Sequence, residues 1–199
     1  MKDKPTSRDL QARETQKKLL ETAMELIAKE GYRSVTVSRI CKECGVAVGT
    51  FYQHFGAKRD IIVLMDREHN EYLGSVCKLD PSKSARELYL TFVEKYMERI
   101  EDSGLALSKS LLLGQLEDNV GDDEAGVYLQ REFLAKVLAY GRATGEFVPE
   151  DVISDEEIFE EFSIGINGIL VTWFLNPETI DLKSYGYKHL GKLLERLEA

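Results

Sequence analysis

Residues 36–55 read TVSRICKECGVAVGTFYQHF, a stretch that predicts two short helices joined by a glycine turn. Thr36 is placed to cap a first helix over Val37–Cys44, because its hydroxyl accepts hydrogen bonds from the first free backbone N–H groups. Gly45 ends that helix, and a second short helix follows over Val48–Phe55. Two short helices in this arrangement are typical of a helix-turn-helix, so the stretch predicts a DNA-reading motif.

The second helix of this motif has an outward face that suits the major groove of DNA. Gln53 is able to pair with two groups of an adenine, and Gly49 permits close approach to the DNA. Lys58 is placed for a phosphate contact, and Tyr52 for a phosphate contact or for stacking on a thymine methyl. His54 is left open between a phosphate contact and local packing. The predicted DNA-contacting residues are Thr36, Ser38, Arg39, Val48, Gly49, Thr50, Tyr52, Gln53, His54 and Lys58.

Cys41 and Cys44 form a C-x-x-C pattern with three interpretations: a redox pair, half of a zinc site, or small buried residues. A zinc site lacks its second half here, and the three histidines show no ligand spacing around the pair. Cys41 stands four residues before the glycine, where crossing helices need a small side chain. The pattern therefore favours two buried packing residues, and we predict no metal site.

The charge is divided unevenly along the chain. The net charge is -9 overall, yet residues 1–60 carry a net +4 and residues 61–199 a net -13. A basic first part and an acidic remainder are typical of a DNA-binding head on a body that does not contact phosphate. Chance asymmetry between two solvated surfaces is the alternative interpretation.

Helical periodicity runs through the rest of the chain and predicts an all-α fold of about nine helices. We expect a DNA-binding domain over 1–57 and a helical body over 58–199. No apolar run approaches the roughly 20 residues of a membrane span, and the first residues lack a signal-peptide pattern, which predicts a cytoplasmic protein without membrane contact. The expected helices are about 9–30, 37–44, 48–55, 58–77, 83–102, 105–117, 123–143, 155–175 and 182–197.

The helix-turn-helix stretch resembles the signature of the TetR family of repressors. That signature reads T-V, I-A and A-G-V-S-K-G-T-L/F-Y-x-H/Y-F, followed by K and L; here residues 36–55, Lys58 and Ile61 correspond to it. The resemblance covers residues 19–65, and beyond them only the layout of helices is similar. Two positions depart from the pattern: Ala47 replaces a hydroxyl residue and Val48 a frequent lysine, which removes a helix cap and a phosphate contact.

The resemblance implies that the last two helices form a four-helix bundle with their copies in a second subunit. Gly165 and Gly168 support this, since they let a neighbouring helix approach closely, and a two-fold protein matches a palindromic double-stranded operator. The alternative is that both helices fill the core of a monomer. The predicted interface residues are Phe162, Ile166, Ile169, Leu190, Leu193, Leu194 and Leu197.

The resemblance also implies that the body encloses a small-molecule effector, and apolar walls with few polar groups are the usual form of such a site. Ordinary core packing is the alternative role for each candidate. No catalytic residue and no cofactor are predicted, since the chain has neither a phosphate loop nor a nucleophile motif. The candidate lining residues are Phe92, Tyr96, Met97, Leu113, Tyr128, Phe133, Tyr140 and Trp173.

The sequence thus predicts a transcriptional repressor that a hydrophobic or aromatic ligand releases from its operator. Two other interpretations stay open at this stage. One is a DNA-binding regulator controlled by a protein partner or by thiol oxidation, with Cys77 as the sensor. The other is an all-α enzyme, which the lack of a reactive cluster disfavours.

Overall fold

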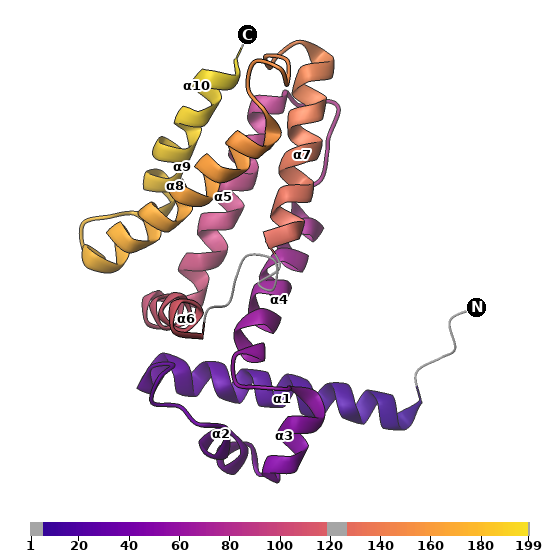
Figure 1. Ribbon diagram of the computed structural model, residues 1–199, viewed down its shortest axis with the longest axis vertical. Helices are drawn as coiled ribbons and strands as arrows, with labels where there is room; N and C mark the ends of the chain where they lie inside the picture. Colours follow the sequence, from indigo (N-terminus) through magenta and orange to yellow (C-terminus); the bar gives the residue numbers. More distant parts are fainter. Residues whose placement is uncertain (1–5, 119–126, 199) are drawn as a thin grey trace. The chain divides into compact units, whose positions relative to one another are not determined.

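The computed structural model describes residues 6–118 and 127–198, without the side chains of 127–130, and these residues are almost entirely helical (Figure 1). Within the described ranges, β-structure is limited to one isolated antiparallel bridge between Phe147 and Glu198. The predicted all-α class is therefore confirmed. The α-helices are α1 (Ser7–Glu30), α2 (Val37–Cys44), α3 (Val48–His54), α4 (Asp60–Val76), α5 (Ala85–Ser103), α6 (Leu105–Asp118), α7 (Val127–Thr144), α8 (Asp155–Leu175), α9 (Leu182–Leu190) and α10 (Leu194–Leu197).

Capping residues explain most of the helix boundaries. Thr6, Ser84 and Ser154 each form a reciprocal capping box with an acidic residue three positions later, and so set the starts of α1, α5 and α8. The helix expected over 182–197 is interrupted: a 3₁₀ turn at Gly191–Leu193 separates α9 from α10. The first residues of the helix expected over 123–143 lie outside the described part of the chain.

The chain folds as two compact units. The first, here called the head, comprises Met1–Asp66 and Ala106–Ala125; the second, the body, comprises Arg67–Leu105 and Gly126–Ala199. By packing, α6 thus belongs with the helix-turn-helix rather than with the helices that follow it. The expected functional boundary after residue 57 stays a prediction.

The head contains its own apolar core, built from α1 to α4 with Leu107 of α6. Two hydrogen bonds join α6 to the rest of the head: the Tyr32 hydroxyl donates to Asp118, and the Gln115 amide donates to the Asp66 carboxylate at 2.7 Å. Gly114 faces the Tyr32 ring so closely that a Cβ there would lie 2.8 Å from it. α6 is therefore docked on the head through both apolar and polar groups.

Helix α8 is the one described helix that is long and apolar enough to cross a membrane by length and composition alone. The sequence expectation that no segment reaches this threshold is thus wrong for α8. Its first turn carries three acidic residues, Asp155, Glu156 and Glu157, and one of its faces is buried in the body core. Core helices of water-soluble proteins also meet the criterion, so this is weak evidence for a membrane span.

Candidate functional site

The helix-turn-helix has the local geometry that its sequence predicts. The Thr36 hydroxyl accepts from the Arg39 N–H at 3.2 Å and caps α2. Gly45 adopts the left-handed conformation, with φ 76° and ψ 30°, which a residue with a side chain rarely adopts. Cys41 and Cys44 are buried in the head core, as predicted for packing residues.

The outward face of α3 is available for contact. Val48, Gly49, Tyr52 and Gln53 are exposed, whereas Thr50 and His54 are half-buried. Phe51 supports this face from inside, since it is fully buried and stacks on Phe55 with 4.9 Å between ring centroids. The geometry places side chains of the types used for phosphate and base contacts on one short exposed helix.

The departure at Ala47 has the expected structural consequence. Ala47 is the residue before α3, and no side chain caps the helix there. The first N–H groups of α3 therefore remain without the side-chain acceptor that a serine or threonine would provide.

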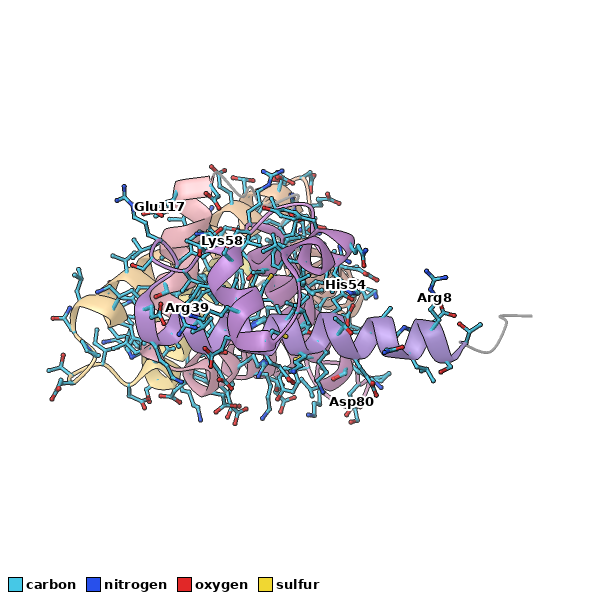
Figure 2. The ribbon with its side chains drawn as sticks, turned by 90° about the horizontal axis from the view of Figure 1, so that it is seen from below. Arg8, Arg39, His54, Lys58, Asp80 and Glu117 are labelled. Atoms are coloured by element: carbon cyan, nitrogen blue, oxygen red, sulfur yellow. The ribbon has the colours of Figure 1, made fainter. Side chains whose placement is uncertain are left out.

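Two basic residues around the motif, Arg39 and Lys58 (both labelled in Figure 2), make contacts inside the head. Lys58 donates through Nζ to the backbone oxygens of Tyr32 at 2.9 Å and Val35 at 3.2 Å. Arg39 forms ion pairs with Glu30 and Glu43. Sequence reasoning missed these contacts. A phosphate contact by Lys58 or Arg39 stays a prediction, and it requires that a phosphate oxygen replaces one of these partners.

The structure counts against a thiol sensor. All three cysteines are free and buried, and Cys77 is only 6% exposed. Burial raises the pKa of the Cys77 thiol to about 11, so the reactive thiolate is scarce at neutral pH. Among the described residues no three histidine, cysteine or acidic side chains gather into a metal site.

The body brings several of the predicted effector residues together. Phe92 stacks on Phe133 at 5.1 Å and contacts Tyr96 at 6.0 Å between ring centroids. Phe162, predicted for the dimer interface, instead joins this aromatic cluster, at 5.8 Å from Phe92. The cluster of Phe92, Tyr96, Phe133 and Phe162, with buried Met97 in the same core, is the candidate effector site.

Other predicted lining residues lie elsewhere. Leu113 is 49% exposed on α6, which belongs to the head, whereas the aromatic cluster belongs to the body. The Tyr140 hydroxyl donates to the backbone oxygens of Pro81 and Lys83, at 3.3 and 3.2 Å, and thus secures the segment before α5. Trp173 is buried in the body core, and the Tyr128 side chain lies outside the described residues.

Most of the predicted interface residues face the interior of their own chain, and their contact with a second subunit stays a prediction. All of them except the half-buried Leu193 are buried in the core of their own chain: Phe162, Ile166, Ile169, Leu190, Leu194 and Leu197. The outward face of α8 instead carries Ile164, Val171 and Leu175, which are 64%, 46% and 73% exposed. This outer stripe follows helical spacing, and Gly168 lies on the same face, where an added Cβ would meet open space.

Comparison with known proteins agrees with this architecture. Residues 19–65 match the family model for bacterial regulatory proteins of the tetR family. The fatty acid metabolism regulator protein of Bacillus subtilis is 28% identical over 172 residues, which span 82% of this chain and 86% of that protein.

Two solved structures share the fold over most of the chain. The fatty acid degradation regulator FadR of Bacillus halodurans has a TM-score of 0.68 at 19% identity, over 90% of this chain and 93% of that one. FadR of Bacillus subtilis, solved in complex with stearoyl-CoA, has a TM-score of 0.65 at 21% identity, over 90% and 98%. Residues 19–65 thus match the DNA-binding domain of the tetR family of bacterial regulatory proteins, and the chain as a whole shares the fold of these two solved regulators.

Proposed function

We propose that the protein is a homodimeric, cytoplasmic repressor, without enzymatic activity, that an apolar ligand releases from a palindromic operator. The observation that carries this proposal is the pairing of two separate features in one chain. The head exposes a short helix whose outer residues suit the major groove, and the body holds a buried aromatic cluster.

The names of the relatives support a fatty acyl compound as the ligand. The relative in B. subtilis is a fatty acid metabolism regulator, and a structural neighbour was solved with stearoyl-CoA. A long acyl chain also suits the cluster of Phe92, Phe133 and Phe162, because these side chains offer only apolar surface. We therefore place an acyl compound first among the effector candidates.

Reciprocal coupling tests this function. If the ligand weakens operator binding by some factor, saturating operator must weaken ligand binding by the same factor. Calorimetric titration of an acyl compound into the free protein and into its operator complex measures both. Equal ligand affinity in the two titrations would contradict the proposal.

If α3 lies in the major groove as proposed, Val48→Lys should make operator binding depend more steeply on salt concentration. Val48 is exposed at the start of α3, where the family pattern often has lysine, so the substitution adds one charge per subunit near the phosphates. Each neutralised phosphate contributes about -0.9 to the slope of log affinity against log salt, so the slope of a dimer steepens by nearly two units. Salt titration of operator and scrambled DNA measures the change.

Two further variants serve as controls for this titration. Gln53→Ala should cost about 1–3 kcal/mol mainly at one base pair per half-site, with the salt slope unchanged. Lys58→Ala should flatten the slope, and it should also destabilise the head because Lys58 holds two backbone oxygens. An unchanged slope for Val48→Lys would mean that residue 48 does not face the phosphate backbone.

The dimer is proposed to form through the outer stripe of α8, Ile164, Gly168, Val171 and Leu175, rather than through the buried residues. Val171→Arg places a charge in the middle of this stripe, and we expect it to leave a single-chain particle of 22.6 kDa at micromolar concentration. Val152→Arg, at an exposed position outside the helix, should leave the dimer intact. Sedimentation showing the unmodified protein as a single chain would refute the interface.

A further inference from the structure

The body contains a small polar cluster at the edge of its aromatic core, formed by α4 and α5. The His69 ring packs against Tyr96 in an edge-on arrangement, 4.9 Å between centroids. On the next turns of the two helices, the Arg99 guanidinium lies over the Tyr72 ring, with 5.4 Å from its central carbon to the ring centroid. Tyr72 is exposed and Tyr96 is buried, so the cluster extends from the surface to the core.

Arg99 has an unusual environment for a half-buried cation. Its Nε is buried with no hydrogen-bond partner, and within the described residues no carboxylate forms an ion pair with it. The carboxylates nearest to it along α5 are engaged elsewhere, since Glu98 pairs with Lys95 and Glu101 with Lys183. A buried guanidinium normally has an anionic or hydrogen-bonding partner, and the Nε of Arg99 lacks one.

His69 adds an unused nitrogen beside this cation. Its Nε2 is buried without a hydrogen-bond partner among the described residues. Burial, with a smaller contribution from the charge of Arg99, lowers the pKa of His69 to about 4, so the imidazole is neutral at physiological pH. A neutral imidazole is able to donate one hydrogen bond to an oxyanion without adding charge.

The polar cluster adjoins the apolar part of the candidate effector site. Tyr96, which contacts His69, also lies 6.0 Å from Phe92 and 6.3 Å from Phe162 between ring centroids. One cation and one neutral donor therefore stand at one end of a continuous group of aromatic side chains. This arrangement matches a molecule with an apolar chain and a single anionic head group.

We propose that Arg99 and His69 bind the oxyanion head group, a carboxylate or a phosphate, of an amphiphilic effector whose apolar chain contacts the Tyr96 and Phe92 rings. The inference rests on the proposed function, because it assigns the head-group end of that same effector site. Arg99 supplies the charge and a planar pair of N–H groups, and His69 supplies one further hydrogen bond.

The test uses decanoate, decyl phosphate and methyl decanoate, which share an apolar chain and differ in the head group. Binding to the full-length protein is followed by the fluorescence of Trp173, the single tryptophan, which is buried in the body. We expect at least one of the two anions to bind at least tenfold more tightly than the ester. A charged hydrogen bond of about 1.5–3 kcal/mol corresponds to a preference of roughly 10-fold to 100-fold.

Three variants test which residues cause the preference for the anions over the ester. Arg99→Gln should remove it by weakening anion binding at least tenfold while leaving the ester unaffected. His69→Phe keeps the ring contact with Tyr96 but loses the nitrogen, so it should weaken anion binding several-fold. Lys95→Gln, which removes a cation from the same helix that is already paired with Glu98, should bind all three probes as the unmodified protein does.

The outcomes separate this proposal from the one on which it rests. Without ligand, the melting temperature of Arg99→Gln should be no lower than that of the unmodified protein, because no carboxylate in the described part of the chain forms an ion pair with Arg99. If Arg99→Gln does unfold, the head-group site is tested by His69→Phe and by the ratio of anion to ester affinity in the unmodified protein. Equal binding of anions and ester, or full anion affinity in Arg99→Gln, overturns the head-group site and leaves the acyl effector in place. Failure of all three probes to bind overturns both.

Discussion

Replacement of Asp66 by asparagine is expected to raise the free energy of unfolding by up to about 4 kcal/mol at pH 8 and to change it little at pH 4. Asp66 is a half-buried carboxyl at the end of the head segment of α4. Burial raises its pKa to about 7, although the hydrogen bond from Gln115 acts in the opposite direction. The ionised carboxylate is therefore costly to keep inside the folded head.

The direction of the pH dependence follows from proton binding. In the folded chain Asp66 keeps its proton up to about pH 7, whereas in the unfolded chain the carboxyl loses it near pH 4. Between these values the folded state binds more protons at Asp66, so the contribution of this group to stability is greatest below pH 4 and falls as the pH rises to 7. Asparagine does not ionise, and its side-chain oxygen still accepts from Gln115.

Urea unfolding of both proteins between pH 4 and pH 8 measures this difference. The gap between Asp66→Asn and the unmodified protein should widen with pH and level off above about pH 7. Glu25→Gln removes an exposed carboxylate from α1 and serves as the control for the change in net charge. A gap that stays constant over this range would show that Asp66 is not the titrating group.

The helix-turn-helix could be predicted because its signals are local. Thr36 and Gly45 set the ends of α2 by contacts with residues no more than four positions away, and Cys41 marks the crossing point by its size. The exposed face of α3 then follows from helical spacing alone. None of these inferences required knowledge of a distant part of the chain.

The orientation of α8 could not be predicted in the same way. This helix is apolar on more than one face, so periodicity offers Ile166 and Ile164 as nearly equivalent candidates for the interior. The structure buries Ile166 against its own chain and exposes Ile164. Only the packing of neighbouring helices, including Leu190 against Gly165, selects the buried face.

Contacts over long sequence separation were also beyond prediction. A lysine at the start of a helix is expected to contact phosphate, yet the Lys58 ammonium donates to backbone oxygens 26 and 23 positions earlier in the chain. The hydrogen bond between Tyr32 and Asp118 joins residues 86 positions apart, and no local sequence pattern predicts it. The assignment of α6 to the head depends on contacts of this kind.

The docking of α6 on the head makes Gly114→Val the second substitution with a large expected effect, a loss of about 2–3 kcal/mol in the stability of the head. A Cβ at this position would lie 2.8 Å from the Tyr32 ring and from Cδ1 of Ile62, closer than unbonded carbon atoms approach. The Ile62 methyl is able to move, but the Tyr32 ring is buried and its hydroxyl is bonded to Asp118. Helix α6 must therefore shift away from Tyr32 and from α4.

The matched control is Gly74→Val, in α4, where no atom lies within 4 Å of the added Cβ, so stability should be unchanged or slightly higher. Ile62→Val combined with Gly114→Ala tests the cause, since removal of Cδ1 relieves one of the two close contacts. Because both sites share that contact, the double variant should be more stable than the sum of the single changes predicts. Thermal unfolding compares these variants with the parent. Equal losses in Gly114→Val and Gly74→Val would show that α6 is not held against Tyr32 at this glycine.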